Sequence, residues 1–166
     1  MIYTKTGDCG LSSTIADSGL YKDDTVFELL GALDELNAHM AVARVQCSGC
    51  IGDAIERLQR ELVCVNAHIA GGDPFDYKST VSLYEQCIDD IESEVEMPCS
   101  IMVFGDCDGA AYINLCRAVA RRCERLAVGF VRERDFDVCL IEYLNRLSDY
   151  LFALSLKFEK IRGDKG

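Results

Sequence analysis

The last part of the chain carries an apolar pattern that alternates between steps of four and three residues. Its members are Leu140, Leu144, Leu147, Leu151, Leu154 and Phe158. Because an α-helix turns once in about 3.6 residues, this alternation places all of them on one face of a helix. A helix from about residue 135 to 161 with such a seam has to bury it against other helices. The pattern therefore predicts a helical bundle.

Four earlier segments also show apolar residues at helical spacing, over residues 25–46, 53–70, 79–94 and 110–131. Asp23 or Asp24 is placed to cap the first of these helices. Strand signals are few and the connections are short. We therefore expect an all-α fold, an antiparallel five-helix bundle with up-down, ferritin-like packing.

The first 24 residues differ from the rest, because they are rich in Gly, Ser, Thr and Asp and show no strong periodicity. We expect an extended polar segment with turns at its glycines. The 166 residues are about the size of one ordinary domain. The sequence thus predicts a single domain over residues 1–166, with residues 25–161 forming the bundle.

The net charge and the hydropathy of the chain exclude some classes of function. Asp and Glu number 28 against 17 Lys and Arg, which gives a net charge of −11. An acidic surface repels phosphodiester backbones, so we expect no nucleic-acid partner. No stretch approaches the roughly 18 apolar residues of a membrane span, and the N-terminus lacks the apolar core of a signal peptide. We expect a cytoplasmic protein without a membrane partner.

Ten cysteines are a high number for a chain of this length. Most lie inside helical patterns, where reduced thiols behave as small apolar side chains. An alternative is a zinc site, in which Cys47 and Cys50 of the one C-x-x-C motif join Cys64 and His68, four apart on one helix. That alternative would make the chain a zinc or thiol protein.

The fourth helical segment carries arginines at i, i+4 and i+8, namely Arg117, Arg121 and Arg125. Like charges four apart destabilise a helix by roughly 0.2–0.5 kcal/mol per pair. In so acidic a chain, the stripe calls for a compensating partner. Carboxylates of neighbouring helices are one candidate, and a bound polyanion such as a triphosphate is the other.

The N-terminal segment offers small residues, hydroxyls and two lysines in a short space. Glycines let a backbone approach a phosphate chain, and hydroxyls can serve phosphate oxygens or Mg²⁺. The motif G-x-x-x-x-G-K-[ST] is absent, so this is not a P-loop. By composition alone the segment is a weak indication of phosphate binding.

Four stretches together resemble the ATP:cob(I)alamin adenosyltransferases of the propanediol-utilisation type. They occur in the family's order and span nearly the whole chain. The first begins YTKTGD and continues through Gly10, Ser12–Thr14 and Lys22–Asp24. The others are GALDELN from Gly31, RAVARRCER from Arg117 and YLNRLSDYLF from Tyr143.

The resemblance implies a five-helix bundle that assembles as a homotrimer, with active sites between subunits. It implies two substrates, ATP with Mg²⁺ and a reduced corrinoid such as cobalamin. Mg²⁺ is expected to arrive with ATP, and no residue of the chain is assigned as its ligand. The Co(I) centre attacks the 5′ carbon of ATP, adenosylcobalamin forms, and triphosphate leaves. A corrinoid reductase and an adenosylcobalamin-dependent enzyme become possible partners.

Residue roles follow from the resemblance where the motifs match. The residues expected to be catalytic are Asp34, Arg117, Arg121 and Glu124. Asp34 and Arg117 match a pair that forms a salt bridge across the subunit interface. The residues expected to bind ATP are Thr4, Lys5, Thr6, Gly7, Ser12, Ser13, Lys22, Arg121, Arg122, Glu124, Arg125 and Asn145.

One stretch departs from the family's pattern. Before the arginine helix the family has a Phe-Ile-Leu-Pro-Gly-Gly-like segment, whose Phe helps to expel the lower ligand of the corrinoid. Here the stretch is IMVFGDC, from Ile101 to Cys107, so that Ile101 takes the place of the Phe and Phe104 could substitute if the loop is shifted. Cys9 also replaces a usual Lys. An alternative hypothesis is therefore a non-catalytic homologue that binds ATP or adenosylcobalamin.

Overall fold

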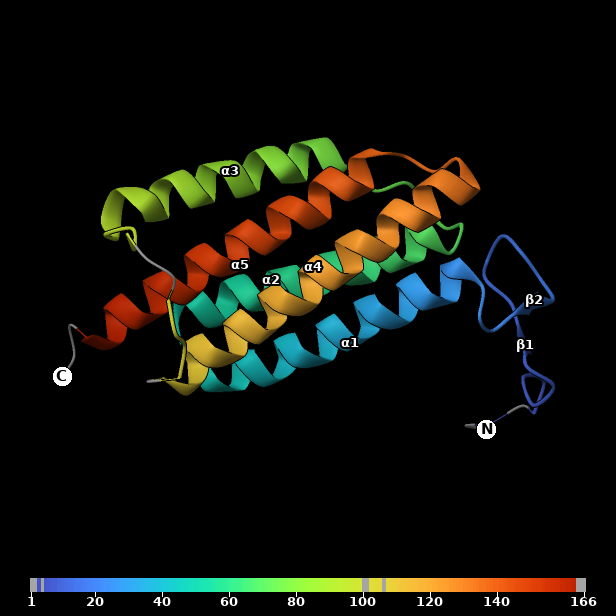
Figure 1. The fold of residues 1–166 in the computed structure, drawn as a ribbon, viewed down its shortest axis with the longest axis horizontal. Coiled ribbons are helices and arrows are strands. Elements are labelled where there is room, and N and C mark those ends of the chain that lie inside the picture. The colour runs from blue at the N-terminus through green and yellow to red at the C-terminus, as the bar shows by residue number, and fades with distance from the viewer. Residues whose placement is uncertain (1–2, 4, 100–101, 106, 164–166) are drawn as a thin grey trace.

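The computed structural model describes residues 3, 5–99, 102–105 and 107–163. The described chain contains five long helices, α1 (Thr25–Gln46), α2 (Cys50–Ile69), α3 (Tyr77–Glu94), α4 (Asp108–Arg134) and α5 (Cys139–Gly163). Successive helices run in opposite directions along one common axis (Figure 1). This arrangement confirms the predicted all-α antiparallel five-helix bundle.

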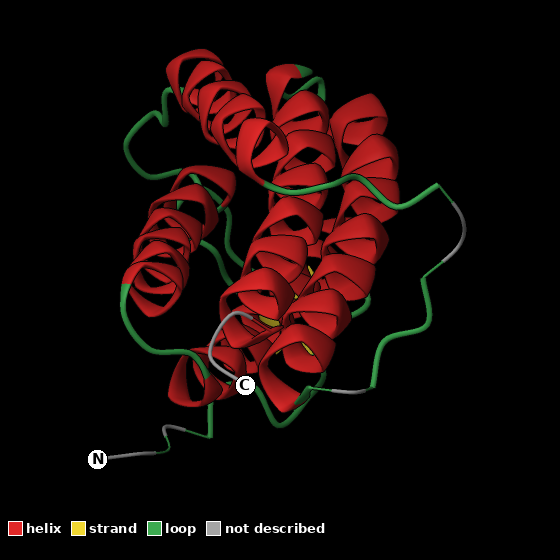
Figure 2. Ribbon diagram, turned by 90° about the vertical axis from the view of Figure 1, so that its left-hand side faces the viewer, coloured by secondary structure: helices red, strands yellow, loops and turns green. Residues whose placement is uncertain are grey.

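The leucine seam of α5 lies at the centre of the bundle, and all six of its residues are buried. Helix α5 packs against α3 and α4, and α1 packs against α2 and α4. Viewed close to the bundle axis, the helices surround a shared interior, and the described parts of the connection from α3 to α4 lie on the outside (Figure 2). The seam is buried because each neighbouring helix contributes its own apolar stripe to the same core.

Two helix boundaries differ from the sequence prediction at the turn between α4 and α5. Helix α4 runs to Arg134, and Asp135, expected to begin the last helix, ends α4 in the left-handed conformation with φ of 50°. Helix α5 begins only at Cys139, whose backbone N–H donates to Asp137 Oδ1 at 2.9 Å. Short polar side chains such as Asp tolerate the left-handed region and accept from free backbone N–H groups, which explains both ends.

Side-chain caps set the starts of α1 and α3, whereas α2 begins without one. Asp24 caps α1, accepting at Oδ1 from Val26 N at 3.0 Å, so the second of the two predicted caps is the correct one. Helix α3 begins at residue 77 rather than 79, because Asp76 caps it through Ser79 N. Helix α2 begins at Cys50, three residues before the predicted start.

The N-terminal segment lies beyond one end of the bundle, beside the start of α1 and the end of α4 (Figure 1). It contains a small antiparallel ladder of β1 (Leu11–Ser12) and β2 (Leu20–Tyr21), in which Leu11 pairs with Tyr21 and Ser12 with Leu20. The rest of the segment is turns and extended chain. No helix in the described parts of the chain is long and apolar enough to cross a membrane.

Candidate active site

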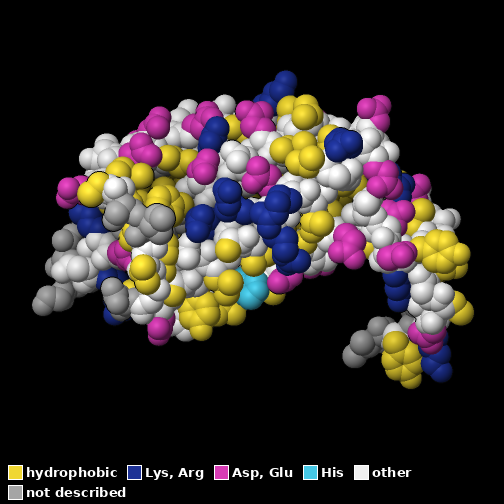
Figure 3. All heavy atoms as spheres, in the orientation of Figure 1, with side chains coloured by type: hydrophobic (Ala, Val, Ile, Leu, Met, Phe, Trp, Pro, Cys, Tyr) yellow, Lys and Arg dark blue, Asp and Glu magenta, His cyan; other side chains and the backbone are white. Residues whose placement is uncertain are grey.

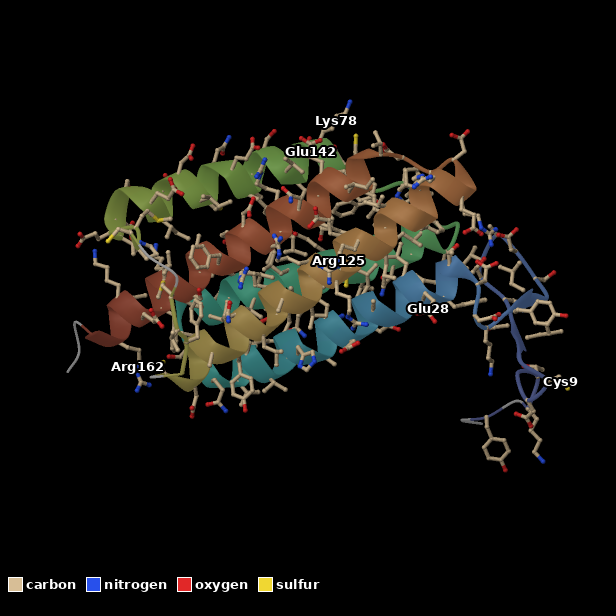
Figure 4. All side chains as sticks on the ribbon, viewed as in Figure 1. Cys9, Glu28, Lys78, Arg125, Glu142 and Arg162 are labelled. Carbon is tan, nitrogen blue, oxygen red and sulfur yellow. The ribbon has the colours of Figure 1, made fainter. Side chains whose placement is uncertain are left out.

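The arginine stripe of α4 has no carboxylate partner among the residues that the structure describes. No carboxylate oxygen of these residues lies within 4.0 Å of a side-chain nitrogen of Arg117, Arg121 or Arg125. Arg125 Nη1 instead donates to the backbone oxygen of Arg121 at 2.9 Å. Basic side chains gather over the middle of α4 (Figure 3), where Figure 4 labels Arg125. The sequence suggested two possible partners for the stripe, carboxylates of neighbouring helices or a bound polyanion. The described helices of this chain do not supply the carboxylates.

The other charged residues of this stretch are held by neighbouring helices. Arg122 pairs with Glu35 of α1, and both side chains are about half exposed. Glu124 accepts a hydrogen bond at Oε1 from Asn145 Nδ2 of α5, at 3.1 Å. Glu124 and Asn145, which the resemblance assigns to ATP, thus meet across the α4–α5 contact beside the arginine stripe.

Arg117 lies against an aromatic side chain of α5. Its guanidinium carbon is 5.8 Å from the centre of the Phe152 ring, and its Nε donates to Asn114 Oδ1 at 2.8 Å. Phe104, from the connection before α4, meets the same Phe152 ring edge-on, with 6.4 Å between the ring centres. Phe104 therefore lies one ring away from a residue expected to be catalytic, whereas Ile101 lies outside the described residues.

Asp34 and Arg117 do not meet within the described chain. Asp34 is exposed on α1, where its Oδ1 accepts from Asn66 Nδ2 of α2 at 2.8 Å. Arg117 makes its contacts with α4 and α5. Asp34 is thus held by α2, while Arg117 is half-buried against α5.

The described residues of the predicted phosphate-binding segment lie beyond the end of the bundle, whereas Arg125 of the stripe lies on the middle part of α4 (Figure 4). Lys22 Nζ lies next to Gly7. A Cβ added to Gly7 would be 3.0 Å from Lys22 Nζ. Ser13 Oγ accepts from Gly19 N at 3.4 Å, and Lys5 has φ of 61°. Figure 4 shows Cys9 of this segment far from Arg125 on α4. Ser12 and Thr6 lie in the same segment, and Thr4 lies outside the described residues.

The alternative zinc site is wrong. Cys47 ends α1 and Cys50 begins α2, whereas Cys64 and His68 lie near the end of α2. With a rise of 1.5 Å per residue, the 14 residues from Cys50 to Cys64 separate the two pairs by roughly 20 Å. No group of three or more potential metal ligands is formed among the described residues. Every described cysteine is free, and burial raises the pKa of the Cys116 thiol to about 12.

Two residues near these elements carry no signal in the sequence. Asn66 holds Asp34, and Arg134 bonds both carboxylate oxygens of Asp24, at 2.7 and 2.6 Å. A basic residue in the last turn of a helix is ordinary, because it complements the helix dipole. The pattern therefore does not distinguish Arg134 from its exposed neighbour Arg132.

The fold is an antiparallel helical bundle in which Arg117, Arg121 and Arg125 pair with no carboxylate of the described residues, and its N-terminal segment is polar and contains glycines. These features define a class of protein suited to bind a polyanion. Comparison with known proteins shows the family to which the chain belongs. The family model described as cobalamin adenosyltransferase matches residues 2–158, and the chain belongs to this family. This finding confirms the resemblance drawn from the four sequence motifs.

The chain is 33% identical to the corrinoid adenosyltransferase of Bos taurus over 93% of its length, which is 69% of that protein. It is 31% identical to a corrinoid adenosyltransferase of Salmonella typhimurium over 93% of its length, and spans about half (48%) of that protein. Among solved structures, a variant PduO-type ATP:corrinoid adenosyltransferase from Lactobacillus reuteri, complexed with cobalamin and ATP, superposes with a TM-score of 0.92 at 25% identity. This match covers 98% of this chain and 93% of the other.

Proposed function

We propose that this chain transfers the 5′-deoxyadenosyl group of ATP to the Co(I) centre of a reduced corrinoid, which forms adenosylcobalamin and releases triphosphate. The observation that carries the proposal is the stripe of Arg117, Arg121 and Arg125, which no described carboxylate neutralises in a chain of net charge −11. A triphosphate is the polyanion that this family's reaction supplies. The proposal also rests on the matching family model.

The arginine helix has a clear task in this reaction. Negative charge grows on the triphosphate as the bond to the 5′ carbon breaks, and fixed cationic donors stabilise that charge. Arg121 and Arg125 are exposed and project from one face of α4, where two guanidinium forks can bind phosphate oxygens. We assign Arg122, Glu124 and Asn145 to the same nucleotide site.

Mg²⁺ enters this proposal with ATP. Protein-bound Mg²⁺ usually takes one or two carboxylates together with substrate phosphates and water. The residues present fit such shared coordination, because Glu124 offers a carboxylate beside the stripe and Ser12 and Ser13 offer hydroxyls. Bound Mg²⁺ would supply charge neutralisation of the phosphates, while the arginines position them.

We propose further that the site is completed between subunits of a homotrimer. The N-terminal segment and the arginine stripe lie apart in one chain, and Asp34 lacks contact with Arg117. The exposed faces of α1 and α4 also carry apolar side chains, among them Val45, which is 83% exposed, and Leu115, which is 39% exposed. Contact with a neighbouring subunit would remove these side chains from water.

The corrinoid side is proposed to include Phe104, packed on Phe152, together with Ile101. With Ile101 in place of an aromatic side chain, we expect poorer handling of cob(II)alamin with its lower base bound than of a corrinoid that lacks a bound lower base. Cytoplasmic location, a corrinoid reductase that supplies Co(I) and an enzyme that uses adenosylcobalamin complete the proposal.

The test is an adenosylation assay under anaerobic, reducing conditions, in which cob(I)alamin and MgATP are mixed with the protein and the cob(I)alamin absorbance is followed. We expect conversion by the wild type and a loss of about 10- to 100-fold in kcat/KM for ATP in Arg121→Ala and Arg125→Ala, because each removes charge-assisted hydrogen bonds. Arg132→Ala, an exposed arginine at the end of α4, is the matched control. Binding of ATP without any turnover would favour the non-catalytic homologue.

A mixing experiment tests the proposed site between subunits. Asp34→Asn and Arg117→Ala are each expected to be nearly inactive, because each leaves its partner's charge uncompensated. In mixed trimers of the two variants, some interfaces combine the intact Asp34 of one subunit with the intact Arg117 of another. Recovered activity in the mixture supports the shared site, whereas a mixture as inactive as its components contradicts it.

A further inference from the structure

The N-terminal segment is attached to the bundle at few points. Its turn at residues 14–17 is closed by Thr14 N donating to Asp17 O at 2.8 Å and by Asp17 N donating to Thr14 Oγ1 at 3.0 Å. The backbone N–H groups of Ile15 and Ala16 both donate to Ala70 O at the end of α2, at 2.9 and 3.0 Å. These contacts fix the turn, and within residues 18–23 the side chain of Leu20 packs against the core of the bundle.

A polar attachment is made by one guanidinium group at the end of α4. Arg134 Nη2 lies 2.7 and 2.6 Å from the two carboxylate oxygens of Asp24, and Nη1 lies 3.6 Å from Asp17 Oδ2. The Arg134 side chain is 28% exposed and that of Asp24 only 19% exposed. Asp17 and Asp24 flank residues 18–23, so one side chain bridges the docked turn and the start of α1 at the two ends of this arc of chain.

The arc contains groups that the nucleotide site needs. It carries Lys22, and its strand β2 pairs with β1, so that Ser12 is bonded to it through Leu20. Lys22 N also donates to Gly10 O at 2.9 Å, which ties the glycine turn to the same arc. Fixing both ends of the arc therefore fixes the position of the lysine and of the hydroxyl-bearing strand together.

We infer that Arg134 is a positioning residue, which holds the N-terminal segment in the place from which Lys22 and Ser12 reach the phosphates of ATP. The inference rests on the proposed function. A segment that is docked only part of the time lowers the apparent affinity for its ligand by the docked fraction. Loss of Arg134 therefore raises the KM for ATP while the transfer step at saturating ATP stays close to normal.

The experiment compares Arg134→Ala, Arg134→Lys and the wild type. In Arg134→Ala we expect the KM for ATP to rise about tenfold or more, because the variant loses charge-assisted hydrogen bonds. The kcat should stay within about threefold of the wild-type value. Arg134→Lys should recover part of the loss, since an ammonium group cannot bridge two carboxylates as a planar fork does. Arg132→Ala, an exposed neighbour without a carboxylate partner among the described residues, is the control and should match the wild type.

A second measurement separates positioning from loss of fold. In ATP-free protein, amide hydrogen exchange over residues 11–22 should be faster in Arg134→Ala than in the wild type, with exchange in α2, α4 and α5 unchanged. Asp17→Asn leaves the Asp24 cap of α1 intact and should raise KM by about two- to threefold, because its ion pair is half exposed.

Two results overturn the inference. One is faster exchange of residues 11–22 with an unchanged KM for ATP, and the other is a fall in kcat at unchanged KM. A wild type that binds no ATP by calorimetry overturns the proposed function instead, and the exchange data then still report whether Arg134 holds the segment.

Discussion

Asn145 of α5 donates a hydrogen bond from Nδ2 to Glu124 Oε1 of α4, at 3.1 Å. The bond joins two residues of the proposed nucleotide site that lie on different helices, and it fixes the Glu124 carboxylate beside the arginine stripe. Both side chains are half-buried, so the bond is shielded in part from water. The α4–α5 contact thus positions the site as well as the core.

We expect Asn145→Ala to lower kcat/KM for ATP by about 10- to 100-fold, the factor for losing a hydrogen bond to a charged group, at 1.5–3 kcal/mol. Thermal unfolding should change little, since the hydrogen bond lies at the edge of the core. Gln86→Ala, which removes an exposed amide from α3, is the control in the same assay. Full activity in Asn145→Ala would show that neither the amide nor its bond to Glu124 serves catalysis.

Phe104 and Ile101 give opposite expectations for the corrinoid side. If Phe104 takes the aromatic role through its contact with Phe152, Phe104→Ala should impair the use of cobalamin and leave ATP binding intact. If Ile101 holds that position, Ile101→Phe should improve the use of cobalamin, because a buried aromatic ring offers roughly 150–250 Å² of apolar surface. The spectrum of bound cob(II)alamin, which reports loss of the lower ligand, distinguishes the two. A wild type that already forms abundant four-coordinate cob(II)alamin contradicts the expected weakness of this stretch.

Two glycines of α4 should respond oppositely to alanine. A Cβ on Gly109 would lie 2.4 Å from Phe158 Cε1 and 3.1 Å from Cys47 Sγ, both buried, so Gly109→Ala should destabilise the protein by about 1–3 kcal/mol. Gly129 is exposed and has no atom within 4 Å of such a Cβ, so Gly129→Ala should stabilise α4 by up to about 1 kcal/mol. Denaturant unfolding at one protein concentration measures both, and equal effects would refute the packing at Gly109.

Asp24 should make stability depend on pH in the acid range. Its hydrogen bond from Val26 N, followed by its bonds from Arg134, holds the pKa of the Asp24 carboxyl below the ordinary Asp value. A lowered folded-state pKa means that the stabilisation is complete above the ordinary value near 3.9 and is lost as the pH falls through the lower folded value. The stability difference between the wild type and Asp24→Asn should therefore be constant from about pH 7 to 5 and shrink below about pH 4. A difference that is independent of pH down to pH 2 would contradict this assignment.

The sequence by itself determined the five helices and the positive charge along one face of α4. Apolar spacing is a local property, so the seam from Leu140 to Phe158 predicted α5 and its burial correctly. The spacing of Arg117, Arg121 and Arg125 likewise placed three cations on one stripe. Helix ends were less predictable, because a single left-handed residue such as Asp135 stops a helix within an otherwise continuous pattern.

Only the tertiary structure decided which charges are compensated. Arg134 and Asp24 are 110 residues apart in the chain, and their bond depends on the end of α4 lying beside the start of α1. For the same reason the sequence could not show that Arg122 has a carboxylate partner while Arg121 lacks one among the described residues. Periodicity fixes which face of a helix a side chain occupies, but the neighbour on that face is set by how the helices pack.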